Sequence, residues 1–575
     1  MVTIAEQEAT AGSHLVALPG TGWHVWRDVV LRTTGFPAAG LDRLTLPAAA
    51  AAADAHLDGA LDAEAYSAAF DQAALDTGRR LGEIAADPRF REAVAWQSPT
   101  AMLGVDGLLR SGPEPRPGEN RRSRLKRGAR EELVVKYWQR YCAKNETTGF
   151  FGPVGWARFD PEGPPVVARP GPGMVRDRRV FLEQWALVAL AERLAEDPEI
   201  RPWLPAGLPP HLALVGRMVL RPAQPPAHLT RAEEAVLARC DGRRPVAHIA
   251  GEVVADPATG LRSPAEVYVL LERLVEQGLV VWGVDLPLRS TVEEQLRDTL
   301  GAIPTPEARG RALDSLRRLT AARDLTAATE GDPNALLAAL AVLDGEFVSV
   351  TGRQPRRRAG EMYAGRTLCF LDATRDIDLV LGRRVLEELA RPLAILLQAA
   401  RWLTVAIADE YGRALRELYD DVAGELGTGE VPLGDLWFLA QGMLFGAGER
   451  PVDRVTAEFS RRWSTLFGLD AVAPGTRRLD LTSGELAAAA VDTFAAERPG
   501  WAGGRVHSPD IHLCASSVEA AAAGDFTLVL GEMHAAWATF DSWVFVTGHP
   551  APDELRDAIL RDLGPDRLLP LIPAH

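Results

Sequence analysis

Apolar residues recur with helical spacing along most of the chain and with strand spacing in a few segments. Residues 1 to about 110 are rich in alanine and have high helix propensity, which predicts a mostly helical region. Residues 366–374, "RTLCFLDAT", and 525–534, "DFTLVLGEMH", have the composition of buried strands. Residues 381–422 predict a long helix, broken or kinked near Pro392. This mixture predicts a large multidomain α+β fold.

A small module is predicted between two larger regions. It starts with two short strands around a turn at Gly216, followed by a helix whose Thr230 and Glu233 have capping-box spacing. A short helix, a third helix after Ser263 as its N-cap and a closing strand complete a winged-helix pattern. We therefore expect an N-terminal region of helices and a basic loop at 1–208, the winged-helix module at 209–290, and an α/β region at 291–575.

The composition is that of an ordinary globular protein, with 47% hydrophobic and 25% charged residues. The net charge of -15 argues against a protein coated in nucleic acid but allows a local basic patch. The four cysteines form no CxxC pair, which indicates reduced thiols and a cytoplasmic location. The first residues lack the apolar core of a secretory signal, and the apolar run at 392–411 is interrupted by Arg401, so we expect a buried helix there.

A cationic stripe precedes an aromatic turn in "KYWQRYCAKNETTGFFGPVGWARF", residues 136–159. Lys136, Arg140 and Lys144 recur every fourth residue, so on a helix they would share one face. Glycines in the turn would let the backbone approach a ligand closely. Clustered cations beside aromatics suit phosphate neutralisation and base stacking, although a solvated helix face has the same pattern.

Two further stretches add positive charge. Residues 111–132 contain Pro115, Pro117 and several charges, which predicts a long mobile loop. Its cations are Arg121, Arg122, Arg124, Lys126, Arg127 and Arg130. Residues 351–376 could complete a groove with the cationic stripe through Arg353, Arg356, Arg357, Arg358 and Arg366. Asp372 ends a predicted strand in this stretch, a position where functional residues often lie.

A histidine and carboxylate cluster is predicted near the C-terminal end. It comprises His507, Asp510, His512, Glu532 and His534. Glu532 and His534 alternate on a strand and should point to the same side. Their spacing matches no HExxH or paired-ligand pattern, so the polar wall of an active site is favoured over a metal site. A metal-dependent hydrolase remains an alternative.

Four stretches resemble the N-terminal, aminoacyl-tRNA-using region of the lantibiotic dehydratases and the related peptide aminoacyl-tRNA ligases. They are "RYCAKNETTGFFGPVGW", "YAGRTLCFLDATRDIDLVLG", "LLQAARWLT" and "SPDIHLCASSVEAAAAGDFTLVLGEMH". In the dehydratases, an Arg, three residues and a second Arg precede Pro-Thr-Pro-Phe-Gly. Arg140 matches the first Arg, Lys144 stands at the second, and Thr148 matches the Thr.

The resemblance implies aminoacyl transfer from a charged tRNA to a ribosomally made precursor peptide. Catalytic roles would fall to Arg140, Lys144, Thr148, Asp372, Glu532 and His534. The tRNA would contact Arg121, Arg122, Arg124, Lys126, Arg127, Lys136, Arg356, Arg357, Arg358 and Arg366. The partners would be tRNA, the precursor peptide and a second copy or a partner chain. We expect no bound metal or cofactor, with ATP as an optional co-substrate.

The family also contains a winged-helix element that binds the leader of the precursor peptide. The third helix of the predicted module holds three glutamates, which favours a peptide over DNA. We expect the leader to bind as an added strand beside the helix at 264–277.

The sequence leaves open which of the family's reactions this chain carries out. Lys144 in place of an Arg, the longer turn and the lack of length for an elimination domain favour an amide-forming ligase. Glutamylation of Ser or Thr, a non-catalytic scaffold and a truncated or split protein stay open.

Overall fold

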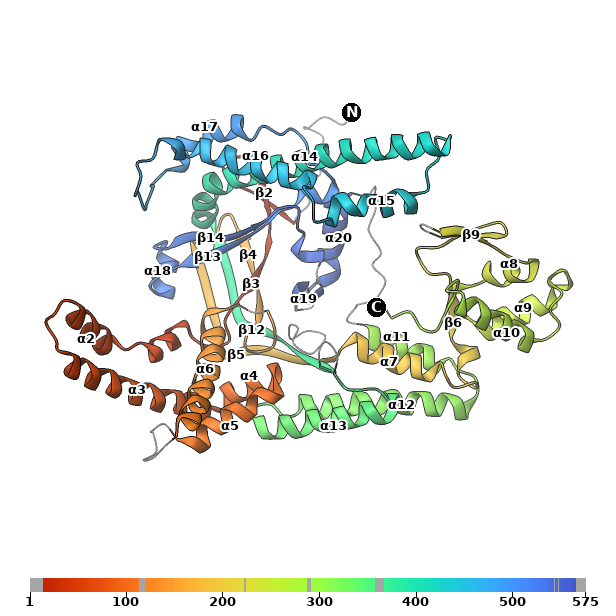
Figure 1. Cartoon of the computed structure of the whole chain (residues 1–575), viewed down its shortest axis with the longest axis horizontal. Coiled ribbons are helices and arrows are strands. Elements are labelled where there is room, and N and C mark those ends of the chain that lie inside the picture. The colour runs from red at the N-terminus through yellow and green to blue at the C-terminus, as the bar shows by residue number, and fades with distance from the viewer. Residues whose placement is uncertain are drawn as a thin grey trace.

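A mixed four-stranded sheet lies at the centre of the computed structural model (Figure 1). The structure describes residues 14–112, 120–145, 147–221, 224–286, 291–356, 367–541, 543–546 and 548–564. The strand order is β3 (Asp28–Arg32), β4 (Val154–Asp160), β12 (Cys369–Gly382), β5 (Val166–Leu182). β12 runs parallel to β4 and antiparallel to β5, and β3 is antiparallel to β4. The predicted strand at 366–374 is therefore part of a longer one, which continues through register shifts near Arg375.

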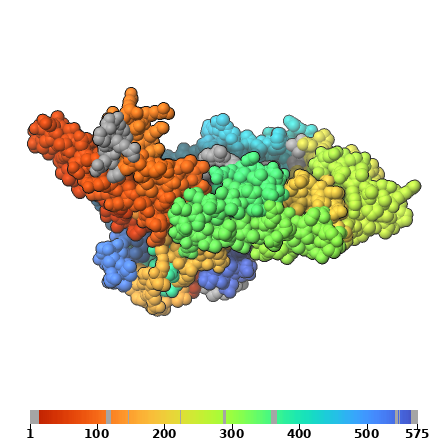
Figure 2. Space-filling view, turned by 90° about the horizontal axis from the view of Figure 1, so that it is seen from below, coloured from red at the N-terminus to blue at the C-terminus, as the bar shows by residue number. Residues whose placement is uncertain are grey.

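The N-terminal region is helical only after its first strands. The helices are α2 (Pro47–Leu57), α3 (Ala63–Ala86), α4 (Pro88–Gln97), α5 (Met102–Ser111) and α6 (Arg121–Ala143). They are preceded by β1 (Leu15–Ala17), β2 (His24–Trp26) and β3. The helical prediction is wrong for residues 24–32, where β-branched and aromatic residues pair in strands instead. Figure 2 shows these helices beside α12 (Pro306–Ala327) and α13 (Pro333–Thr351) on one face.

The predicted basic loop at 111–132 is helical in its second half. Helix α6 begins after Asn120, whose side chain accepts a hydrogen bond from the Ser123 backbone N–H at 2.9 Å. Arg130 donates to the Gly107 carbonyl at 3.0 Å and fastens α6 to α5. An N-cap and a tertiary anchor therefore override the high charge that favoured a loop.

The middle of the chain contains the predicted hairpin, capped helices and closing strand. The elements are β6 (Pro205–Gly207), β7 (Ala213–Val215), β8 (Met218–Arg221), β9 (Gln224–His228), α8 (Arg231–Leu237), β10 (Asp241–Pro245), α9 (Val246–Ala255), α10 (Pro264–Glu276) and β11 (Val281–Trp282). Thr230 and Glu233 form the expected capping box, and Ser263 caps α10. Strand β6 lies before the expected boundary at 209 yet pairs with β10 and β11. A winged-helix architecture for this module stays a prediction.

A helical layer and a C-terminal region complete the structure. The helical layer holds α7 (Gln184–Leu194), α11 (Val292–Gly301), α12 and α13, which share one large core with the N-terminal helices and the middle module. The C-terminal region holds α14 (Arg383–Leu426), α15 (Leu433–Phe445), α16 (Pro451–Leu466), α17 (Ser483–Thr493), β13 (Ser508–Cys514), α18 (Val518–Ala523), β14 (Thr527–His534), α19 (Trp543–Val546) and α20 (Pro552–Leu563). A second core joins the start of α14 to the central sheet and the β13–β14 hairpin.

Helix α14 continues through Pro392, so the predicted break there is wrong, because packing of its first turns against the sheet holds the helix together. The predicted strand at 525–534 is confirmed as β14. Helices α13 and α14 have the length and hydropathy of membrane spans, but core helices pass the same test. Both bury residues in the two cores, including Leu336 and Leu386.

Candidate functional site

The turn after α6 is anchored to the core by its aromatic residues. Phe150 and Phe151 are buried, and the Phe151 ring lies 5.3 Å from that of Tyr141. The Gly149 N–H donates to the Leu371 carbonyl of β12 at 2.9 Å. Gly35 approaches the Phe151 backbone so closely that a Cβ atom would lie 2.1 Å from its Cα. The two turn phenylalanines are thus buried and unavailable for stacking on a base.

A strained residue lies in the same turn. Thr147 has φ of 56°, a left-handed conformation that a β-branched residue rarely adopts. Thr148, the expected counterpart of the motif threonine, is half-buried beside it. Strain of this kind is often found at ligand-binding turns.

The three cations of the stripe do not form one face. Lys136 is exposed and pairs with Glu132 of the same helix at 2.6 Å. Arg140 is half-buried near the last turn of α6, and Lys144 lies beyond the helix end with extended backbone. The sequence spacing assumed a helix through residue 144, whereas α6 ends at Ala143. Arg140 and Lys144 therefore flank the turn rather than continue a stripe.

The remaining expected tRNA contacts lie in two places. Arg121, Arg122, Arg124 and Lys126 are exposed on the first turns of α6, and Arg127 is half-buried near Glu131. In the second basic stretch, Arg353 pairs with Glu192 of α7, and Arg356 lies 3.7 Å from Asp344 of α13. Arg357, Arg358 and Arg366 lie outside the described residues. The two described arginines of the second stretch thus pair with α7 and α13, and a groove shared with the first stretch stays a prediction.

Asp372 lies on β12 next to Leu371, whose carbonyl accepts the hydrogen bond from the Gly149 N–H of the turn. It is half-buried and opposite Arg179 of β5. Burial raises its carboxyl pKa to about 6, although the Ala373 N–H donates to it at 2.9 Å and favours the charged form. A carboxylate that titrates near neutral pH is suited to proton transfer.

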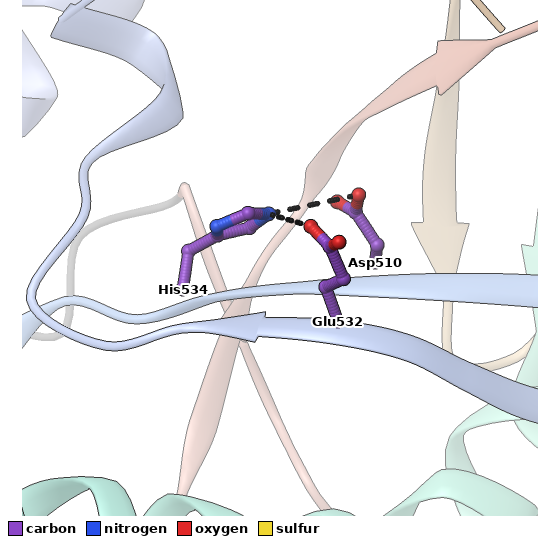
Figure 3. A group of neighbouring side chains, drawn as sticks. All are labelled: Asp510, Glu532 and His534. Atoms are coloured by element: carbon purple, nitrogen blue, oxygen red, sulfur yellow. Dashed lines mark ion pairs between the residues drawn. The ribbon is translucent and has the colours of Figure 1, made fainter.

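The β13–β14 hairpin brings three polar side chains together (Figure 3). His534 Nε2 lies 3.4 Å from Glu532 Oε2 and 3.7 Å from Asp510 Oδ2. The expectation that Glu532 and His534 point to one side is confirmed. His512 lies on the same hairpin but is outside this three-residue group.

Arg32, which the sequence analysis did not single out, connects the hairpin to the turn. Its Nη1 donates to Asp510 Oδ2 at 3.1 Å, and its Nη2 donates to the Asn145 carbonyl at 3.0 Å. Its Nε is buried and has no hydrogen-bond partner among the described residues. The only sequence signal was a cation at the end of a short apolar segment, "DVVLR", which has no motif spacing.

His507 belongs to the support of the site. Its Nδ1 accepts the Ala536 backbone N–H at 3.1 Å, and Ala536 has φ of 56°. Burial, together with the positive charge of Arg401, lowers the His507 pKa to about 4. The imidazole is therefore neutral near pH 7 and acts as an acceptor that holds the turn after His534.

The three hairpin residues could in principle hold a cation, since their donor atoms lie within 4.8 Å of one another. The guanidinium of Arg32 already pairs with Asp510, however, and a second cation there would be repelled. The group is better suited to hydrogen bonding and proton transfer. The absence of a bound metal stays a prediction.

The protein has a large α+β architecture around a central mixed sheet. An arginine joins the turn at the end of α6 to a hairpin that carries carboxylates and a histidine. The chain belongs to the family described as "Lantibiotic dehydratase, N terminus", whose model matches residues 86–564. A comparison with curated proteins finds no match.

Solved structures of similar fold are about 17% identical in sequence, which shows the fold alone. The tRNA-dependent lantibiotic dehydratase MibB from Microbispora sp. 107891 aligns with a TM-score of 0.56, 17% identity and coverage of 84% of this chain. This chain spans 45% of the length of MibB. The glutamylation domain TbtB from thiomuracin biosynthesis, bound to 5'-phosphodesmethylglutamycin, aligns with a TM-score of 0.54 and 17% identity, covering 95% of this chain and 73% of TbtB.

Proposed function

We propose that this chain modifies a ribosomally made precursor peptide with an aminoacyl group taken from a charged tRNA. The family and the two similar structures support this class of reaction, because one is tRNA-dependent and the other is a glutamylation domain. They favour glutamyl transfer to a Ser or Thr hydroxyl. The free cysteine thiols, three of them buried, are compatible with a cytoplasmic location.

The observation that carries the proposal is the Arg32 connection. Arg32 joins two parts of the protein: the turn, which lies between Arg140 and the central sheet, and the hairpin, which holds Asp510 and His534. Segments that resemble the family in separate parts of the sequence thus meet at one place, which is required if they act on one substrate.

The chemistry assigns each group a task. A hydroxyl of the peptide attacks the aminoacyl ester carbonyl, the C–O bond to the tRNA ribose breaks, and an ester to the peptide forms. His534, within reach of Glu532 and Asp510, takes the hydroxyl proton, and the leaving ribose oxygen receives one. Arg140 and Lys144 at the turn stabilise the negative charge on the tetrahedral oxygen.

Lys144 favours a second candidate, amide formation. An exposed ammonium at this position is a point charge and lacks the bidentate geometry of the arginine in the dehydratase motif. In this branch a phosphoryl group from ATP activates the peptide C-terminal carboxylate, and the amino group of the aminoacyl-tRNA attacks it, loses a proton and displaces phosphate. A non-catalytic scaffold that only delivers peptide and tRNA is the third outcome.

One assay separates the three. The purified chain is incubated with the precursor peptide encoded nearest its gene and with pre-charged glutamyl-tRNA, with and without ATP, and the peptide mass is read before and after mild base. A base-labile product that forms without ATP supports glutamylation. A base-stable, ATP-dependent product, with other pre-charged tRNAs tested in turn, supports the ligase branch. Peptide that stays unmodified with every tRNA contradicts both and supports the scaffold.

A further inference from the structure

Helix α15 exposes large apolar side chains near the end of α14. Six of them are at least half exposed: Leu426, Leu433, Trp437, Phe438, Leu439 and Phe445. The three aromatic residues by themselves expose roughly 300–400 Å². With the three leucines the surface exceeds the largest apolar patch of a typical monomer, which is about 300–600 Å². Patches of this size are found where proteins bind partners.

The exposed side of α15 is arranged to receive another apolar surface. Phe438, Gly442 and Phe445 follow one another at i, i+4 and i+7, so they lie on one face of the helix. A Cβ atom at Gly442 would have no neighbour within 4 Å, which leaves room for a partner's side chain between the two rings. The other side of α15 packs on α14, where the Tyr411 hydroxyl donates to the Met443 carbonyl at 3.3 Å.

Negative charge surrounds this apolar face. Residues 417–449 contain no lysine, arginine or histidine, and their acidic residues are Glu417, Asp420, Asp421, Glu425, Glu430, Asp435 and Glu449. Four of these carboxylates are exposed and form no ion pair with any described residue: Asp420, Asp421, Glu425 and Glu430. The end of α14 and the loop before α15 therefore border the apolar face with uncompensated acids.

The arginines nearest to this stretch do not neutralise it. Arg413 pairs with Glu417 at 2.9 Å, and Arg450 pairs with Asp453 of its own helix at 2.8 Å. Arg416 lies one helical turn before Asp420 and can compensate one of the four carboxylates at most.

This charge decides among the possible occupants of the apolar face. The carboxylates would repel the phosphates of a tRNA. Helices that bind anionic membranes carry lysine and arginine beside their apolar face, which this stretch lacks. A second copy related by a two-fold axis would place the same carboxylates opposite themselves. The chemistry that remains is a different protein with an apolar surface flanked by cations.

We propose that α15 and the end of α14 dock a second, different protein through a basic amphipathic helix. Apolar residues of the partner at helical spacing cover Phe438 and Phe445, and flanking lysines or arginines pair with Glu425 and Glu430. In Figure 1, α15 lies apart from α6 and from the β13–β14 hairpin, so the docked partner leaves the candidate site open. This inference goes beyond the proposed reaction and holds for either of its branches.

The test uses the full chain and two labelled amphipathic helical peptides as probes, one of leucine and lysine and one of leucine and glutamate. Anisotropy should show binding of the leucine–lysine peptide alone, and hydrogen exchange of residues 417–445 should slow when it is bound. Phe438→Ser and Phe445→Ser should each weaken binding about tenfold or more, as for aromatic anchors. Equal binding of both peptides, or unchanged affinity in both variants, would refute the proposal.

Matched variants show whether the effects are local. Leu103→Ser, at a 73% exposed leucine of α5, should bind the leucine–lysine peptide as the natural chain does. A joint Glu425→Lys, Glu430→Lys variant should bind more weakly and with a smaller salt dependence. Glu307→Lys, at an exposed residue of α12, should bind normally. If the joint variant binds as well as the natural chain, the acids do not select the partner and a cationic partner is the wrong assignment.

Two measurements test the other occupants. Sedimentation velocity should give the same oligomeric state for the natural chain and Phe438→Ser. A dimer that Phe438→Ser dissociates would assign the surface to a second copy and overturn the proposal. A chain that ends at Gly564 should bind the leucine–lysine peptide with unchanged affinity. Tighter binding would show that residues 565–575 cover this surface, which would also overturn it.

The docking and the reaction can fail separately. Phe438→Ser should form peptide product at the rate of the natural chain. If product forms but the leucine–lysine peptide does not bind, the docking surface is wrong and the reaction stands. If docking depends on Phe438 as expected but no aminoacyl group is transferred, the docking surface stands and the reaction is wrong.

Discussion

Arg32 is the most informative single position, because it joins the α6 turn to the β13–β14 hairpin. Replacing it with alanine removes hydrogen bonds to Asp510 and to the Asn145 carbonyl. Hydrogen bonds from charged donors contribute about 1.5–3 kcal/mol each when buried. The Arg32 and Asp510 side chains are 32% and 33% exposed, so screening reduces this to about 1 kcal/mol each. We expect Arg32→Ala to lower the free energy of unfolding by about 2 kcal/mol.

The effect on the reaction should exceed the effect on stability. Without the connection, the hairpin and the turn lose their mutual placement, and a displacement of about 1 Å can reduce a rate roughly a hundredfold. Arg32→Lys keeps the charge but cannot bridge two acceptors in the same fork, so its kcat should lie between those of the alanine variant and the natural chain.

The assay is peptide product formation over time, with denaturant unfolding run in parallel. Arg478→Ala serves as the control, because Arg478 and Asp480 form an ion pair whose side chains are 81% and 74% exposed. If Arg32→Ala loses stability but keeps kcat, Arg32 only supports the fold. If neither quantity changes, Arg32 does not join the turn to the hairpin in solution.

Three further predictions concern charge and pH. Lys144→Ala should weaken tRNA binding and reduce the slope of log affinity against log salt by about one, and an unchanged slope would place Lys144 outside the interface. Asp372→Asn should be more stable than the natural chain above pH 6, by up to about 3 kcal/mol, because burial raises the Asp372 pKa to about 6, and this difference should be lost towards pH 4. A variant that gains stability but loses product formation identifies a functional carboxylate, whereas a variant that keeps full activity removes Asp372 from the site. Neutral His507 should contribute its full stabilisation above pH 6.5, and this contribution should fall as pH drops towards 4, because the folded pKa of His507 is about 4. His507→Gln should lose this pH dependence, and a curve of stability against pH identical to that of the natural chain would contradict the assignment.

The sequence predicted elements with strong local signals. The capping box at Thr230 and Glu233, the N-cap at Ser263 and the strand ending at His534 all appear as expected. Each depends on a short pattern that local physical chemistry already determines. The pairing of Glu532 with His534 follows for the same reason, because alternation along a strand fixes their common side.

The expectations that failed depended on tertiary contacts. The spacing of Lys136, Arg140 and Lys144 assumed a longer α6, whose end is set where the turn packs its phenylalanines into the core. Arg32 was missed because it lies far from Asp510 in sequence and no spacing rule links them. A site assembled from β3, the α6 turn and a C-terminal hairpin becomes visible only when the chain is folded.

The favoured reaction is transfer of a glutamyl group from tRNA to a peptide hydroxyl on this protein. Glutamyl-tRNA charged with radiolabelled glutamate, freed of synthetase and ATP, is mixed with the chain and its precursor peptide, and the label is followed on a gel. We expect label to move from the tRNA to the peptide, and ribonuclease treatment of the tRNA beforehand to prevent this. Label that stays on the tRNA would contradict glutamyl transfer, and label that reaches the peptide equally well with Arg140 and His534 both replaced by alanine would contradict the assigned site.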